Sequence, residues 1–230
     1  MNVRPLSRDE VRGIDARAAE GLKLPTLVLM ENAGRGAAAW LRDRIGGTNP
    51  TARVVVACGP GNNGGDGGVV ARHLDAWGFA VRVAWFVHPD RLHGDAATQR
   101  DILGRSRIEA ITVPDDADSA HLDALWADAD WVVDALLGTG VTRPVEGPIA
   151  RSIASINRSG RPVLALDLPS GLDADTGQPL GDAIRATATC TFVAPKLGFG
   201  KNEANAYTGE VTVIDIGVPR LILAPYLDPR

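Results

Sequence analysis

The stretch RVVVACGPGNNGGDGG, residues 53–68, decides the fold class of this 230-residue chain. Its first half is a short, continuous apolar run, which is typical of a strand buried on both faces of a parallel sheet. We expect its glycine-rich second half to connect that strand to a helix over 68–77. Glycines there let the backbone approach a phosphate, and a helix N-terminus supplies unpaired N–H groups. The stretch predicts an α/β fold with a candidate anion-binding loop; a glycine-rich turn without ligand is the alternative.

Strand-like and helix-like segments alternate along the rest of the chain. The predicted strands are 53–58, 81–87, 109–113, 131–136, 163–167, 188–193 and 211–214, and the predicted helices among them are 68–77, 93–103, 118–127 and 148–158. This alternation predicts a parallel sheet covered by helices. The sequence has no linker, repeat or second composition regime, so we expect a single domain over residues 1–230.

Two helices are predicted before the first strand. The S-x-x-E spacing at residues 7–10 is a capping box, in which two side chains satisfy backbone donors at a helix start, and predicts a helix over 8–20. A second helix begins after Pro25 and ends at the Gly46-Gly47 pair.

Composition and charge limit the function classes. With 45% hydrophobic and 23% charged residues the chain is typical of globular proteins. Its 24 Lys and Arg against 28 Asp and Glu give a net charge of −4, which argues against binding to nucleic acid or anionic membranes. Cys58 and Cys190 lie in apolar runs, which favours buried thiols in a reducing compartment. No apolar run is long enough to span a membrane, so we expect a cytoplasmic protein.

Two further predicted strands end in a carboxylate. Asp134 precedes the loop LLGTG, and Asp167 precedes LPSG. Ligands of open parallel sheets bind outside the carboxyl ends of the strands. We therefore expect residues 62–66, Asp134, residues 138–144 and residues 167–170 to converge on one cleft.

The glycine spacing at positions 59, 61 and 64 formally satisfies G-x-G-x-x-G. A conventional dinucleotide site also needs an acidic residue at the end of the second strand to bind the ribose. The predicted strand 81–87 ends without one, and the next carboxylate is Asp90. A conventional NAD(P)-dependent oxidoreductase is therefore disfavoured.

Together these motifs resemble those of the N-terminal YjeF family, the NAD(P)H-hydrate epimerases. The matching segments, in the order of the family, are LMENAG (29–34), GPGNNGGDG (59–67), DALLGTG (134–140), LDLPSG (166–171) and PKLG (195–198). The resemblance implies a Rossmann-like three-layer αβα sandwich with a mostly parallel sheet, N-terminal helices packed on it, and a homodimer. No dehydratase-like segment follows Arg230 in the sequence, so we expect a stand-alone epimerase that works with a separate NAD(P)HX dehydratase.

The resemblance also implies a set of site residues. It assigns substrate binding to Asn62, Asn63, Gly64, Gly65, Asp66, Gly138, Thr139, Gly140, Val141, Thr142, Arg143, Pro144 and Asp167. It assigns one potassium ion per subunit to Asn63, Asp134 and Ser170. One carboxylate with an amide and a hydroxyl oxygen suits a monovalent cation. A hydrogen-bonded loop without metal is the alternative.

The activity implied by the resemblance is epimerisation of the R and S forms of hydrated NADH and NADPH (NADHX and NADPHX) at C6 of the nicotinamide ring. Asp167 is the candidate general acid/base, because it ends a buried strand beside the glycine-rich loops, where partial desolvation would assist proton transfer near neutral pH. A non-catalytic nucleotide- or protein-binding scaffold of the same fold is the alternative. For Lys196, contact with an anion and simple loop packing both remain open.

Overall fold

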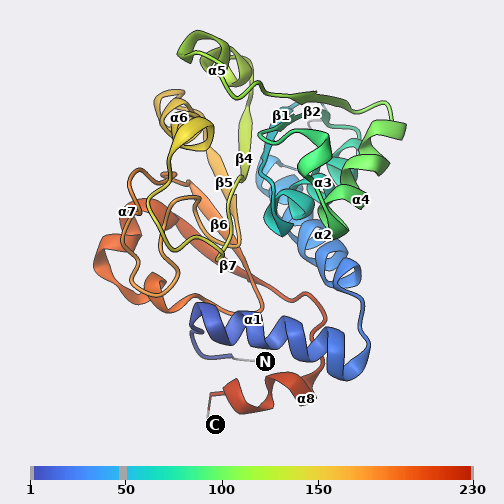
Figure 1. Cartoon of the computed structure of the whole chain (residues 1–230), viewed down its shortest axis with the longest axis vertical. Coiled ribbons are helices and arrows are strands. Elements are labelled where there is room, and N and C mark those ends of the chain that lie inside the picture. The colour runs from blue at the N-terminus through green and yellow to red at the C-terminus, as the bar shows by residue number, and fades with distance from the viewer. Residues whose placement is uncertain (1–2, 47–50, 229–230) are drawn as a thin grey trace.

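The sheet at the centre of the molecule has seven strands in the order β3-β2-β1-β4-β5-β6-β7, and each neighbouring pair is parallel. The computed structural model describes residues 3–46 and 51–228 (Figure 1). The strands are β1 (Arg53–Cys58), β2 (Ala80–Trp85), β3 (Glu109–Thr112), β4 (Trp131–Ala135), β5 (Val163–Leu166), β6 (Ala188–Phe192) and β7 (Glu210–Ile214). Strands β2 and β4 lie on opposite sides of β1, so the chain changes its direction across the sheet there.

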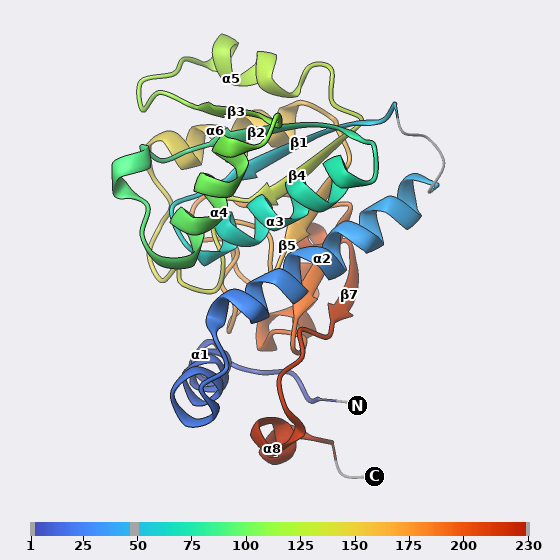
Figure 2. The same ribbon diagram turned by 90° about the vertical axis from the view of Figure 1, so that its right-hand side faces the viewer.

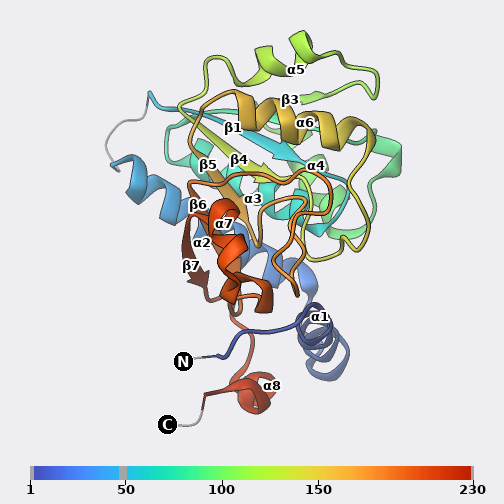
Figure 3. The ribbon, with the colours of Figure 1, turned by 90° about the vertical axis from the view of Figure 1, so that its left-hand side faces the viewer.

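Helices cover both faces of this sheet. The α-helices among the described residues are α1 (Arg8–Ala16), α2 (Thr26–Ile45), α3 (Asn62–Ala76), α4 (Gly94–Arg105), α5 (Ser119–Trp126), α6 (Gly147–Arg158), α7 (Asn205–Thr208) and α8 (Arg220–Leu223). Helices α2, α3 and α4 lie on one face (Figure 2) and α5 and α6 on the other (Figure 3). Successive side chains of β1 alternate between two hydrophobic clusters: Val54 and Val56 belong to one, Val55 and Ala57 to the other. This confirms the predicted three-layer fold.

The N-terminal helices form as the sequence indicates. Ser7 and Glu10 make the predicted capping box at the start of α1. The predicted helix 8–20 corresponds to α1 followed by a π-helical turn, Arg17–Gly21. Helix α2 begins directly after Pro25 and ends at Gly46, whose φ of 98° is left-handed; Gly47 lies outside the described residues.

The start of α3 differs from the prediction. The helix begins at Asn62, six residues before the predicted start at Gly68, so the supposed glycine-rich loop is its first two turns. Glycine disfavours a helix interior by about 1 kcal/mol relative to alanine, which is why the sequence indicates a loop. Close packing explains the glycines: a Cβ at Gly64 would lie 2.1 Å from the carbonyl oxygen of Gly59, and one at Gly67 would lie 2.6 Å from the Cβ of Ala135.

All the predicted strands are present, and their ends differ from the predicted ends by at most two residues. Helices α7 and α8 were not predicted, because four-residue helices show no hydrophobic periodicity. Cys58 and Cys190 are buried free thiols, as predicted.

The segment before α1 is fixed against the loop that follows β6. The backbone N–H of Leu6 donates to the carbonyl of Pro195 at 2.9 Å, and that of Leu197 donates to Leu6 at 2.9 Å. At the start of α1, Arg8 forms a buried ion pair of 2.6 Å with Asp173 in the long loop between β5 and β6. These contacts hold α1 beside the carboxyl ends of β5 and β6.

Candidate active site

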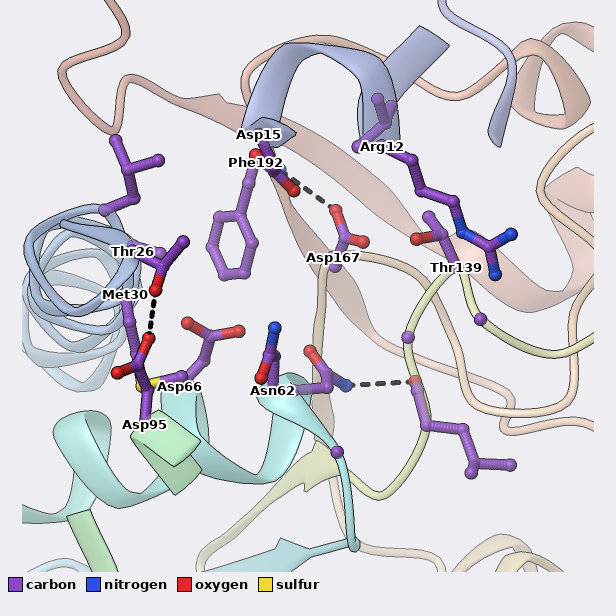
Figure 4. A pocket seen from close by; sticks show the side chains of 18 of the residues that line it. Arg12, Asp15, Thr26, Met30, Asn62, Asp66, Asp95, Thr139, Asp167 and Phe192 are labelled. Atoms are coloured by element: carbon purple, nitrogen blue, oxygen red, sulfur yellow. Dashed lines mark hydrogen bonds between the residues drawn. The ribbon is translucent and has the colours of Figure 1, made fainter. Parts of the chain in front are cut away.

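A cavity of about 500 Å³ opens at the carboxyl ends of the central strands (Figure 4). Its walls come from the segments that follow β1, β4, β5 and β6, and from α1, α2 and the start of α4. It lies where the sheet order reverses between β1 and β4, which is where ligands bind in open α/β sheets. The predicted site residues that line it are Asn62, Asn63, Asp66, Gly138, Thr139, Gly140, Val141 and Asp167.

Other predicted site residues lie behind or beside this wall. Gly64 and Gly65 are buried in α3, where Gly64 packs on Gly59 and Gly65 on Met30. Residues 142–144 continue the loop beyond its cavity-lining part. We therefore expect Gly64 and Gly65 to act through the close packing of α3.

The first turn of α3 presents polar side chains to the cavity. The Asn63 side chain donates through Nδ2 to the carbonyl of Leu137 at 2.9 Å. Its Oδ1 is buried and accepts no hydrogen bond from the described part of the chain. A buried acceptor without a donor is costly, so this oxygen is available to a ligand.

Asp134 and Ser170 form a buried network beneath the loop that carries Leu137. The Ser170 hydroxyl donates to Asp134 Oδ1 at 2.6 Å, and the Ser170 backbone N–H donates to Oδ2 at 2.8 Å. The Leu137 N–H in turn donates to the Ser170 hydroxyl oxygen at 2.8 Å. Burial raises the pKa of Asp134 to about 6 although these hydrogen bonds oppose it. Asn63 and Ser170 thus both hydrogen-bond to the backbone of Leu137.

Asp167 follows β5 and is paired with Lys196. The Lys196 side chain is fully buried, and its Nζ lies 2.5 Å from Asp167 Oδ1. The same ammonium donates to Thr191 Oγ1 at 2.9 Å and to the Phe192 carbonyl at 3.1 Å. Of the two roles left open by the sequence, Lys196 therefore contacts an anion: the carboxylate of Asp167.

Strands β5 and β6 end in the same type of strained turn. Asp167 has φ of 66° and Val193 has φ of 68°. In each turn the next N–H donates to the carbonyl two residues back: Leu168 to Leu166 and Ala194 to Phe192, both at 2.8 Å. Positive-φ γ-turns are rare, and such residues cost on the order of 1–3 kcal/mol each. Both strained residues line the cavity.

Asp66 and Asp15 bring two further carboxyl groups to the cavity. Burial raises the pKa of Asp66 well above its usual range, and the charges of Asp167 and Asp15 add to this shift. Burial, with a contribution from Asp167, raises the pKa of Asp15 to about 6. Asp66 therefore favours its protonated form, beside an Asp167 that faces an ammonium group.

The sequence motifs did not indicate Asp15 as part of this site, nor Asp167 as the anion that Lys196 contacts. Asp15 lies four positions after the buried Val11 and so shares its helix face, which is a usable signal. An acidic residue is nevertheless usually assigned to the solvent-facing side of a helix. The approach of Asp15 to Asp167 joins chain segments about 150 residues apart, which no local pattern reveals.

Replacing Asp15 by asparagine should stabilise the protein at pH 8 by about 1–3 kcal/mol. The folded chain binds the Asp15 proton more tightly than the unfolded chain, so this carboxyl lowers stability as the pH rises toward and through 6. Most of the gain should be lost at pH 4, where the folded-state carboxyl is protonated and the unfolded-state carboxyl is about half protonated. Urea unfolding at the two pH values measures it, with Asp9→Asn on the exposed side of α1 as the control. An equal effect of Asp15→Asn at pH 4 and pH 8 would contradict the shifted titration.

Comparison with known proteins adds a family match. The family described as YjeF-related protein N-terminus matches residues 26–198. An NAD(P)H-hydrate epimerase of Rhodopirellula baltica is 40% identical over 226 residues, which cover 98% of this chain and 89% of that protein. A second protein with the same name, from Pirellula staleyi, is 43% identical over 216 residues, covering 94% and 93%.

Longer relatives and a solved structure agree with this match. The bifunctional NAD(P)H-hydrate repair enzyme Nnr of Salinibacter ruber is 42% identical over 225 residues, which cover 95% of this chain and 41% of that protein. The crystal structure of yeast YNL200c superposes with a TM-score of 0.76 at 24% identity and covers 92% of this chain and 87% of that one. That structure supports the fold.

Proposed function

This chain belongs to the family of YjeF-related protein N-termini, and we propose that it is an NAD(P)H-hydrate epimerase. It is an isomerase that interconverts the R and S forms of NADHX and NADPHX at C6 of the nicotinamide ring. The relatives that carry this name match nearly the whole chain at 40% and 43% identity. The cavity at the switch point of the sheet is the place for this reaction.

The observation that carries the mechanism is that Asp66 and Asp167 line one cavity in different surroundings. Epimerisation opens a bond at C6 and closes it from the other face, whether the ring C6–N1 bond or the C6–O bond opens. When the C6–N1 bond opens, N1 gains a proton and the C6 hydroxyl loses its proton to become an aldehyde oxygen. When the C6–O bond opens, the hydroxyl gains a proton and leaves as water, which leaves an N1=C6 iminium. Closure from the other face reverses the same proton transfers. Asp167, oriented by Lys196, accepts and returns a proton, and Asp66, whose pKa burial raises well above its usual range, is the neighbouring donor. Pairs of carboxyls with different environments are well suited to such roles.

The remaining lining residues bind the substrate. The backbone of residues 138–141 and the side chains of Asn62 and Asn63 face the cavity. Thr142, Arg143 and Pro144 support that loop. The second strand supplies no ribose carboxylate, because β2 ends at the buried Trp85. The site therefore differs from that of a conventional dinucleotide oxidoreductase.

The direct test is to mix the purified protein with hydrated NADH and follow both diastereomers by chromatography. We expect a separated diastereomer to approach the equilibrium mixture much faster with enzyme than in buffer. A rate equal to that in buffer, for a protein shown to be folded, would favour the non-catalytic scaffold.

A potassium ion fits the network of Asn63, Asp134 and Ser170. The buried Asn63 Oδ1 lacks a donor within the described residues, and the other two side chains add hydroxyl and carboxylate oxygens around Leu137. All are hard oxygen donors with only one carboxylate, and this low total charge suits a monovalent cation better than a divalent one. The ion would supply fixed positive charge that orders this loop beside the substrate.

Potassium should therefore stabilise the folded chain more than ionic strength alone does. Binding to the folded state only adds about 2.7 kcal/mol when K⁺ exceeds its Kd a hundredfold. The thermal midpoint should rise more in KCl than in choline chloride at equal concentration, and Ser170→Ala should remove most of that difference. Equal midpoints of the unmodified protein in the two salts would rule out the ion site.

Three wider expectations rest on the family assignment. We propose a single domain, supported by the one continuous sheet, and a homodimer in the cytoplasm. We also propose that the chain works with a separate NAD(P)HX dehydratase, since relatives named bifunctional repair enzymes contain the matched segment within a longer chain. Across residues 3–46 and 51–228, no helix has the length and apolar character needed to cross a membrane.

A further inference from the structure

The acidic and basic side chains that line the cavity are distributed unevenly. Four carboxyl groups line it: those of Asp15, Asp66, Asp95 and Asp167. Within the described parts of the chain, Arg12 is the one basic side chain in its wall. Arg12 lies on α1, outside the segment 26–198 that matches the family. The family match therefore assigns it no role.

The position of Arg12 is fixed although its side chain is exposed. Helix α1 is anchored by its capping box, by the ion pair between Arg8 and Asp173, and by the buried Val11 and Ile14. The Arg12 guanidinium makes no hydrogen bond or ion pair with residues 3–46 or 51–228. Figure 4 shows it extending toward Thr139, in the glycine-containing loop after β4. A preplaced cation thus faces that loop without a protein partner.

We propose that Arg12 binds the diphosphate of the hydrated dinucleotide, an inference that rests on the proposed epimerase function. A diphosphate carries negative charge and is disfavoured beside the carboxylates of Asp95 and Asp167, which also line the cavity. Arginine pairs with phosphate oxygens through two parallel N–H donors. Gly138 and Gly140 have no side chain, so at these two positions the backbone of the opposite loop is open to a diphosphate. Holding the diphosphate at Arg12 directs the nicotinamide ring to Asp66 and Asp167.

The test uses ADP-ribose, which has the diphosphate but no nicotinamide, and adenosine, which has no phosphate. Calorimetric titration of Arg12→Gln should show ADP-ribose binding weakened about tenfold or more, with adenosine binding unchanged. Arg12→Lys should recover part of the loss. Arg35→Gln is the matched control, because Arg35 is an exposed arginine on α2 that does not line the cavity.

Kinetics give an independent measurement. Arg12→Gln should raise KM for NADHX and NADPHX to a similar extent and change kcat much less, since the diphosphate is common to both. An increase confined to NADPHX would assign Arg12 to the extra phosphate and overturn the diphosphate proposal. Unchanged ADP-ribose affinity and KM in a variant of an active epimerase would overturn the Arg12 assignment alone. If the unmodified protein neither binds ADP-ribose nor epimerises NADHX, the proposed function fails and this inference with it.

Discussion

Asp167→Asn should lower kcat for epimerisation by about 10²–10⁴ while weakening substrate binding much less. Asparagine keeps the shape of the side chain and an oxygen that can accept from Lys196, whose Nζ lies 2.5 Å from Asp167 Oδ1. The asparagine amide cannot accept and return a proton during opening and closure of the bond at C6. The measurement is the initial rate of interconversion of the NADHX diastereomers, with Kd for ADP-ribose measured in parallel.

The control for this substitution must separate catalysis from folding. Removing the carboxylate leaves the buried Lys196 without its counter-ion, and an uncompensated buried charge is strongly destabilising. Thermal unfolding of Asp167→Asn should therefore be checked first. Asp95→Asn is the matched variant, because Asp95 also lines the cavity but accepts a hydrogen bond of 2.5 Å from the Thr26 hydroxyl. The Asp95→Asn enzyme should keep most of its activity. A folded Asp167→Asn enzyme with nearly unchanged kcat would limit Asp167 to positioning the nucleotide and transfer its role to Asp66 or water.

Gly59→Ala should prevent stable folding, with a loss of more than about 4 kcal/mol. A Cβ at Gly59 would lie 1.7 Å from the carbonyl oxygen of Leu136 and 2.6 Å from its carbonyl carbon. The Gly59 N–H also donates to Ala135 at 3.0 Å, so the backbone cannot move away without breaking the junction of β1 and β4. Soluble yield and urea unfolding measure this loss.

Gly61→Ala is the control for that prediction. A Cβ there meets no atom within 4 Å, and its φ of −101° suits any residue. Its stability should change by less than about 1 kcal/mol. If the two variants unfolded at the same urea concentration, the close approach of the β1 and β4 ends would not determine stability.

The sheet could be predicted from the sequence because its signals are local. Val54, Val55 and Val56 form an unbroken apolar run, and only a strand covered on both faces buries all three. The carboxylates of Asp134 and Asp167 could be placed at strand ends by position alone. The convergence of their loops then follows from parallel strand geometry.

The parts that could not be predicted depend on contacts between distant segments. The predicted start of α3 was wrong because it relied on the low helix propensity of glycine. Gly64 and Gly67 instead allow close packing against Gly59 and Ala135, which only the folded sheet brings near. The pairing of Asp167 with Lys196 depends on a turn at each strand end. No local pattern indicates that Asp15 of α1 lies beside Asp167.

The contacts that hold α1 have a consequence for synthesis on the ribosome. Arg8 and Asp173 are separated by 165 positions, and Leu6 pairs with Lys196 still later in the chain. Helix α1 therefore has no complete docking surface until about 165 further residues have been synthesised. During that time the apolar face of α1, with Val11 and Ile14, has no surface of the β5–β6 loops to cover it. The wall that carries Arg12 and Asp15 is thus synthesised long before it can dock, so a nascent chain acquires its complete cavity only after the Lys196 segment has left the exit tunnel.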